Sequence, residues 1–156
     1  MKRVGKDHRG GPFQLHIMKF DSCQGPKNKN CTYSDPSGTV IDNGHLVTKV
    51  TVLENTTPSK GKILALSNGK ELLRLQMNNP CEHLFLRPLL EKWFKISKNC
   101  MILKGTYNLK MNVEEMVDDY FGGKFFYGNV SFKTIFYEND CNFCCSNIFL
   151  TIVPKN

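Results

Sequence analysis

The sequence lacks long hydrophobic runs: no stretch approaches the roughly 18 apolar residues that a transmembrane helix needs. It also lacks the composition of a disordered chain, because 40% of its residues are hydrophobic and 11% are aromatic. Its 156 residues are too few for two full domains but enough to bury about 68–70% of the surface that the unfolded chain exposes. We therefore expect one globular domain that is soluble or peripheral to a membrane.

Catalytic signatures are scarce as well. Gly69-Lys70 is not part of a phosphate-binding loop, because the position that needs glycine is Leu64 and the position that needs serine or threonine is Glu71. There is no G-x-S-x-G elbow, no H-E-x-x-H pair and no dinucleotide-binding glycine pattern. The histidines form no recognisable catalytic pair; they are His8, His16, His45 and His83. We expect no enzyme activity, no catalytic residue and no cofactor.

Positive charge is concentrated at the start of the chain. The net charge is +7, and four basic residues with Asp7 leave +3 within the first ten positions. Residues 1–12 are expected to form a flexible basic tail, which could also touch anionic lipid head groups or nucleic acid. With neither an RNP1 pattern nor a basic recognition helix, we expect no nucleic-acid partner. The acidic run from Glu114 to Asp119 is expected to be a solvated loop rather than a carboxylate site.

Cysteine is abundant: 7 of 156 residues is high for a cytosolic protein, whose thiols are kept reduced. Three Asn-x-Ser/Thr sequons, at Asn30, Asn55 and Asn129, would accept glycans in the secretory route. No signal peptide is visible, since residues 1–12 carry charges but no apolar segment. The chain is then mature or trimmed, has a misassigned start, or is cytosolic. Cysteines and sequons together favour a secreted, extracellular glycoprotein.

The cysteine spacing does not favour a metal site. Cys141-Asn142-Phe143-Cys144 is a C-x-x-C step beside Cys145, but a structural zinc site needs a second pair at comparable spacing, which Cys81 and Cys100 do not provide. A thioredoxin-like motif needs a helix that starts after a strand, whereas Cys141 is expected in a turn before the last strand. We expect no metal.

Disulfides fit the layout of the chain better. Cys23 follows the first expected strand and Cys144 or Cys145 precedes the last one, so a bridge there would tie the two ends of the chain. Closing a loop of more than 100 residues contributes about 4.7 kcal/mol in the chain-entropy model. Cys81 with Cys100 would clamp the helical segment, Cys31 is a partner for Cys141, and the odd total leaves at least one thiol free or intermolecular. The cysteines expected in disulfides, with their connectivity open, are Cys23, Cys31, Cys81, Cys100, Cys141 and Cys145.

Alternation of apolar and polar residues predicts several short strands. Ser67-Asn68-Gly69-Lys70 predicts a tight hairpin turn, because Asn-Gly supplies the positive φ that such a turn needs. Residues 81–95 have apolar side chains three to four apart, which predicts one short helix with Pro88 at its first position, and residues 21–38 are expected to be an irregular or stapled loop. The expected strands are 13–20, 45–53, 62–66, 71–77, 129–137 and 146–153. This pattern predicts an all-β, antiparallel sandwich or barrel over residues 13–156.

Three motifs resemble a known family. Cys81 precedes the short helix, and Cys100-Met101-Ile102-Leu103-Lys104-Gly105-Thr106-Tyr107 is similar to the C-P-x-x-x-G-x-Y step of the ML-type lipid-recognition family, with Met101 in place of the family's proline. Tyr127-Gly128-Asn129-Val130 resembles the G-x-Y opening of the family's penultimate strand, with Val130 in place of tyrosine, and Cys145 with residues 147–152 resembles its last strand. The resemblance is strongest to the lysosomal ganglioside activator protein and its insect chemosensory relatives.

The resemblance implies an immunoglobulin-like sandwich whose sheets are splayed apart, leaving an apolar cavity for acyl chains. Such a cavity stays dry and accepts hydrocarbon, with about 0.8 kcal/mol from each buried methylene group. Strand alternation identifies an inward face but not whether that face encloses a void, so much of the set is expected to be ordinary core. The candidate lining residues are Leu15, Ile17, Val50, Leu64, Leu66, Leu73, Leu75, Phe85, Leu89, Trp93, Ile135 and Leu150.

The aromatic segment at residues 120–127 is a second candidate site. Consecutive aromatic residues cannot all point inward from one strand, and Gly122-Gly123 permits hinge motion, so some rings could form a cavity lid or a loop that dips into a membrane. Lys124 could meet a head-group phosphate. An equally weighted alternative is a strand end whose rings cap the core. The candidate lid or membrane-contact residues are Tyr120, Phe121, Lys124, Phe125 and Phe126.

Two functions follow from these expectations. The first is an extracellular, non-enzymatic protein that carries or presents a lipid or other long hydrophobic ligand, with a membrane surface or a receptor as a further partner. The resemblance to insect relatives implies a chemosensory or pheromone-related role. The second is an extracellular protein-interaction or co-receptor module with a solid core and no ligand. A void between the sheets distinguishes the two.

Overall fold

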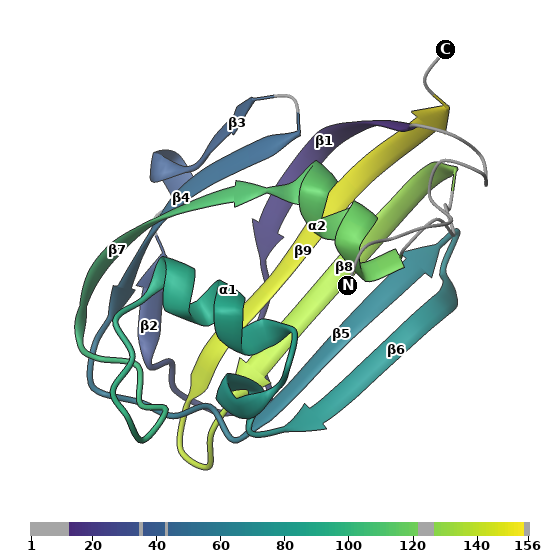
Figure 1. The fold of residues 1–156 in the computed structure, drawn as a ribbon. Helices are drawn as coiled ribbons and strands as arrows, with labels where there is room; N and C mark the ends of the chain where they lie inside the picture. The colour runs from purple at the N-terminus through teal and green to yellow at the C-terminus, as the bar shows by residue number, and fades with distance from the viewer. Residues whose placement is uncertain (1–12, 35, 43, 122–126, 155–156) are drawn as a thin grey trace.

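Two antiparallel β-sheets pack against each other, with two short helices in front of the larger sheet (Figure 1). The computed structural model describes residues 13–34, 36–42, 44–121 and 127–154. The expected basic tail at residues 1–12 lies outside these ranges. The predicted all-β antiparallel sandwich is confirmed. Within the described ranges, no helix has the length and apolar character needed to cross a membrane.

The larger sheet has five strands in the order β1-β9-β8-β5-β6. These strands are β1 (Phe13–Ser22), β9 (Asn142–Pro154), β8 (Gly128–Tyr137), β5 (Lys60–Ser67) and β6 (Lys70–Asn78). All pairs are antiparallel, so the sheet brings the first and last strands of the domain side by side. A bulge between residues 17 and 19 of β1 shifts which of its side chains face inward.

The smaller sheet is built around β4 (His45–Val52). Strand β7 (Gly105–Asn112) pairs with the full length of β4. The short strands β2 (Thr32–Ser34) and β3 (Val40–Asp42) pair with the two halves of β4 along its other edge. A 3-10 turn at Pro36–Gly38 separates β2 from β3.

The β5–β6 hairpin forms at the predicted turn. Asn68 and Gly69 both have positive φ, of 52° and 75°, and Ser67 pairs with Lys70. Positive φ at both central residues gives a turn whose twist matches that of the flanking strands. This turn therefore sets the pairing of β5 with β6.

Helix α1 (Leu86–Trp93) lies in the predicted region but begins two residues before Pro88. The expectation that Pro88 occupies the first helical position is wrong. Proline is tolerated as the third residue because the N–H groups of the first helical turn have no partner inside the helix. A second 3-10 turn at Pro80–Glu82 precedes α1, and the Cys81–Cys100 disulfide ties this turn to the segment that follows α1.

A second helix, α2 (Val113–Phe121), forms where a solvated acidic loop was expected. The Asn112 side chain accepts a hydrogen bond from the N–H of Glu115 at 3.0 Å, which caps the first turn. Acidic residues in that turn complement the helix dipole. Val113 and Val117, four residues apart, bury one face of the helix against the sheets. Glu115 is exposed, so at least part of the acidic run lies on the solvent face of an amphipathic helix rather than in a loop.

Two other boundaries differ from expectation. The segment expected as an irregular loop over residues 21–38 contains the end of β1 and all of β2. Strand β9 begins at Asn142 rather than at residue 146. Both extensions follow from backbone pairing across the loop, because the N–H of Cys23 donates to the carbonyl of Cys145 and that of Cys31 to the carbonyl of Asn142.

The buried core is divided into two clusters. One lies by α1 and includes Leu90, Phe94 and Phe136. The other lies by α2 and includes Leu15 and Leu150. A single contiguous core is usual for a domain of this size. The buried residues of this domain therefore form two groups rather than one.

Candidate functional site

An apolar cavity of about 350 Å³ lies between the two core clusters. Its wall is formed by both sheets together with α1 and Met116 of α2. This volume falls at the lower end of the about 300–1,000 Å³ typical of small-molecule sites. The apolar lining residues are Phe20, Val50, Ile63, Leu86, Leu89, Leu90, Trp93, Phe94, Leu109, Met111, Met116, Phe136, Phe143 and Ile148.

Helix α1 supplies one continuous side of the cavity. Leu86, Leu89, Leu90 and Trp93 follow the i, i+3, i+4, i+7 spacing of one helix face, and all four line the cavity. The opposite face carries an ion pair between Arg87 and Glu91 at 3.1 Å. The Trp93 indole donates a hydrogen bond to the carbonyl of Lys110 on β7 at 3.3 Å, which holds this ring against the smaller sheet.

Aromatic rings close the cavity beneath α1. The ring of Phe94 packs edge-on against Tyr107, with 4.9 Å between centroids, and against Phe143, with 5.6 Å between centroids. The Tyr107 hydroxyl donates to the carbonyl of Leu103 at 2.7 Å, so the polar end of this ring is satisfied away from the cavity. This end of the cavity is therefore both apolar and well packed.

The cavity wall carries hydroxyl and amide groups but no charge. Among the described lining residues there is no Asp, Glu, Lys, Arg or His. Thr32 donates to the carbonyl of Phe143 at 2.6 Å, and the Thr48 and Thr39 hydroxyls lie 2.9 Å apart. The polar lining residues are Ser22, Asn30, Thr32, Tyr33, Ser34, Thr48, Thr134, Asn142 and Ser146.

Of the twelve candidate lining residues, Val50, Leu89 and Trp93 line the cavity. Three others, Leu15, Ile17 and Leu150, are buried in the cluster beside α2 and fill the core there. Phe85 is 64% exposed in the turn that precedes α1, outside the wall.

The remaining candidates lie on β5, β6 and β8. Gly61, Ile63 and Ala65 face inward from β5, so Leu64 and Leu66 lie on the opposite side of the sheet. By the same alternation, Ile135 faces away because Thr134 and Phe136 line the cavity. Leu73 and Leu75 share the inward face, opposite Ala65 and Ile63, but belong to the edge strand beyond the cavity.

Several lining residues could not be chosen from the sequence. Ile63 is followed by three consecutive apolar residues, so alternation did not say which of them face inward. Phe20 faces inward only because of the bulge in β1. A usable signal existed for Met116, since Asn112 followed three positions later by Glu115 is typical of a helix start.

Most of the candidate lid lies outside the residues that the structure describes. Tyr120 and Phe121 belong to the last turn of α2, and Lys124, Phe125 and Phe126 lie outside the described residues. Tyr127, at the other end of the segment, is 42% exposed. The lid and membrane-contact role stays a prediction.

Six cysteines form three disulfides, and all six are among those expected in disulfides from the sequence. Cys23 is bonded to Cys145, Cys31 to Cys141, and Cys81 to Cys100. The first two bonds tie the segment between β1 and β2 to the start of β9 at neighbouring points. Cys141 and Cys145 are thus oxidised, so neither offers a thiolate to zinc.

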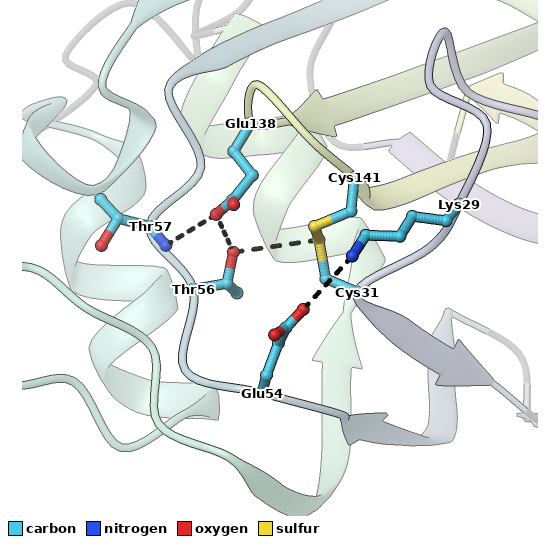
Figure 2. Close-up of polar contacts among 7 residues, drawn as sticks. All are labelled: Lys29, Cys31, Glu54, Thr56, Thr57, Glu138 and Cys141. Atoms are coloured by element: carbon cyan, nitrogen blue, oxygen red, sulfur yellow. Dashed lines mark hydrogen bonds and ion pairs between the residues drawn. A yellow bond between two sulfur atoms is a disulfide. The ribbon is translucent and has the colours of Figure 1, made fainter.

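A polar clamp, formed by Thr56, Thr57 and the half-buried Glu138, lies on one side of the Cys31–Cys141 bond (Figure 2). The hydroxyl of Thr56 donates to the carboxylate of Glu138 and lies 3.9 Å from the sulfur of Cys31. The backbone N–H of Thr57 donates to the same carboxylate at 3.3 Å. Potential metal-ligand atoms of Cys31, Glu138 and Cys141 lie within 4.8 Å of one another, but the two sulfurs are bonded to each other. This cluster joins the loops before β2, before β5 and after β8.

Cys144 is the free cysteine among the described residues, and it lines the cavity. Burial raises the pKa of its thiol from 9.0 to about 12, although a hydrogen bond with the backbone of Phe136 acts in the opposite direction. The thiol is therefore almost entirely protonated at neutral pH, which makes it a poor nucleophile.

We expect native Cys144 to resist alkylation. At pH 9 about half of an unfolded thiol is ionised, whereas a pKa of about 12 leaves about one thousandth of the native thiol ionised. Iodoacetamide labelling followed by mass spectrometry should be about five-hundredfold slower for the native protein than in guanidinium chloride. Cys144→Ala provides the blank, and equal labelling rates would place the thiol outside the cavity wall.

All three sequon asparagines are exposed. The Asn55 side chain accepts a hydrogen bond from the N–H of Lys104 at 2.7 Å, and that of Asn129 accepts one from Thr151 at 2.9 Å. Asn30 lies at the cavity wall, where its side chain accepts a hydrogen bond from Asn142 at 3.0 Å. Their exposure is compatible with the predicted glycosylation.

Comparison with protein-family models found no match, and no curated protein matches the sequence. Among solved structures, the chain is similar to the crystal structure of chicken MD-1 complexed with lipid IVa. The two share 11% sequence identity with a TM-score of 0.39, over 90% of this chain and 96% of that chain. Neither value supports an inference from that protein to this one.

Proposed function

We propose that this protein is an extracellular, non-enzymatic carrier of a lipid or other long hydrophobic molecule. The observation that carries the proposal is the apolar cavity of about 350 Å³ that separates the two core clusters. A void lined by leucine, phenylalanine and tryptophan costs stability when it is empty and gains free energy when hydrocarbon fills it. A solid interaction module would have no reason to retain such a void.

The disulfides support the extracellular part of the proposal. Disulfide bonds persist in oxidising compartments and are rare in cytosolic proteins, and this chain has three of them. The exposed sequons agree with a secretory route. The chemosensory or pheromone-related refinement rests on the sequence resemblance alone.

The lack of charged side chains among the described lining residues supports a binding role. No described lining residue carries a carboxylate, imidazole, ammonium or guanidinium group, and the thiol of Cys144 stays protonated. General acid–base catalysis needs a titratable group near the operating pH in contact with the substrate. The cavity is thus suited to holding a molecule rather than transforming it.

We expect the protein secreted from eukaryotic cells to carry a bound molecule. Native mass spectrometry should show an added mass at near one-to-one stoichiometry, which organic extraction then releases and identifies. The same material denatured before measurement is the control for covalent modifications, glycans included. A bare native mass, together with no uptake of the apolar fluorophore phenylnaphthylamine, would contradict the proposal and favour the interaction module.

A further inference from the structure

Three hydroxyl groups form a row across the inner face of the larger sheet. Ser22 on β1 pairs directly with Ser146 on β9, and Ser146 pairs directly with Thr134 on β8. Directly paired residues of antiparallel strands share a face, with Cβ atoms about 4.5–5.5 Å apart. All three residues line the cavity. Their hydroxyls therefore lie side by side on one wall.

The row lies between apolar positions of the larger sheet. On one side, Phe20, Ile148 and Phe132 occupy the neighbouring inward positions of the same three strands. On the other side, Cys144 is paired with Phe136. A polar row between two apolar rows is not what packing of a dry core selects.

The hydroxyl groups of the row are available for hydrogen bonds to a ligand. Within the described part of the chain, the side chains of Ser22, Ser146 and Thr134 make no hydrogen bond. Ser34 lines the cavity from β2, in the other sheet, and its hydroxyl is also unbonded among those residues. Each hydroxyl offers one donor and two acceptor positions. These groups can therefore bind a polar part of a ligand.

The row begins at Ser22 on the edge strand β1 and runs inward along the larger sheet through Ser146 and Thr134. The most exposed lining residues, Ser22, Asn30 and Tyr33, lie on the β1–β2 side, so the cavity meets solvent there. Helix α1 lines the cavity with the buried residues Leu86 and Leu90, and the buried ring of Phe94 follows it. A ligand with a polar head and an apolar tail fits with its tail toward α1.

The lack of charged lining residues and the volume of the cavity limit the class of ligand further. A carboxylate, phosphate or ammonium head would find no opposite charge among the described lining residues, and burying an unpaired charge is costly. The volume of about 350 Å³ accommodates one chain rather than several.

We propose that the cavity selects an uncharged, single-chain amphiphile, such as a long-chain alcohol or a monoacylglycerol. Its hydroxyl or carbonyl groups bond to Ser22, Ser146 and Thr134, and its chain extends to α1. This inference rests on the proposed carrier function and specifies the ligand class of the same cavity.

A series of twelve-carbon probes with different heads tests the selectivity. Dodecanol and monolaurin should displace phenylnaphthylamine from the wild-type protein at concentrations at least tenfold lower than laurate at pH 8, where the carboxylate is ionised. Dilauroylphosphatidylcholine, which has a charged head and two chains, should not displace it. Laurate binding as tightly as dodecanol would overturn the inference.

The combined variant Thr134→Val with Ser146→Ala tests the hydroxyl row itself. Loss of two hydrogen bonds should weaken dodecanol binding about tenfold or more and leave dodecene binding unchanged. Thr106→Val, an exposed hydroxyl on β7, is the matched control and should change neither. An unchanged ratio of dodecanol to dodecene affinity would overturn the inference while the carrier function stands. If neither dodecene nor phenylnaphthylamine binds the wild-type protein, the carrier function fails as well.

Discussion

Val50→Trp is expected to abolish the uptake of hydrophobic ligands without unfolding the protein. Val50 lies on β4 and its side chain lines the cavity, with Ser34 and Tyr107 as its neighbours on the flanking strands. An indole ring at this position would extend into the void and occupy the space of a ligand chain. Each methylene group displaced loses about 0.8 kcal/mol, so blocking a chain of about ten methylenes costs well over a thousandfold in affinity.

The thermal midpoint separates this effect from misfolding. Filling a void restores contacts that the empty wall lacks, so the midpoint of Val50→Trp should equal or exceed that of the wild-type protein. Thr51→Trp is the control, because the neighbouring residue on β4 faces away from the cavity and should bind phenylnaphthylamine normally. Met111→Trp blocks the same space from β7 if the first variant is unstable. Normal uptake by a folded Val50→Trp variant would show that ligands bind elsewhere.

The sequence predicted the sheets better than it predicted the cavity. Six of the strands and the Asn68-Gly69 turn were recognisable because alternation and positive-φ residues are local properties. The orientation of β5 and β8 was not, since each has apolar residues at adjacent positions, such as Ile63 with Leu64 and Ile135 with Phe136. A choice of inward face needs the packing partner, which lies far away in the chain.

The void is not a local property at all. It depends on how α1 and the two sheets pack together, and the Cys23–Cys145 bond, which joins segments far apart in the sequence, is part of its wall. The hydroxyl row likewise appears only when the register of three strands is known, because Ser22, Thr134 and Ser146 are separated by up to 124 positions in the sequence. In contrast, the start of α2 is recognisable in the sequence from its Asn112–Glu115 cap, although the acidic composition that follows favours a solvated loop.

Removing both long-range disulfides is expected to unfold the protein, whereas removing either one alone is not. The Cys23–Cys145 bond spans 122 positions and the Cys31–Cys141 bond spans 110. Because the second is nested inside the first, each one restrains almost the same loop. With Cys31–Cys141 intact, the other bond closes only the short segments between Cys23 and Cys31 and between Cys141 and Cys145, a ring of about twelve residues.

The chain-entropy model then gives unequal costs. Loss of one bond removes a ring of about 15 residues or fewer, which is worth about 3 kcal/mol. Loss of both also opens a loop of more than about 100 residues, worth about 4.7 kcal/mol more. The sum of nearly 8 kcal/mol is comparable to the whole stability of a domain, which is about 5–15 kcal/mol.

Urea unfolding of alanine variants in a Cys144→Ala background measures these costs without thiol exchange. The two variants that each lack one bond should remain folded. Cys31→Ala/Cys141→Ala should have the lower free energy of unfolding, because that bond is fully buried beside the Thr56–Glu138 clamp. The variant with all four cysteines replaced by alanine should lose more free energy of unfolding than the chain-entropy model assigns to either bond alone. It should show no folded baseline at 37 °C. Equal costs of about 4.7 kcal/mol for each single removal would mean that the bonds act independently, and the nested-loop explanation would then be wrong.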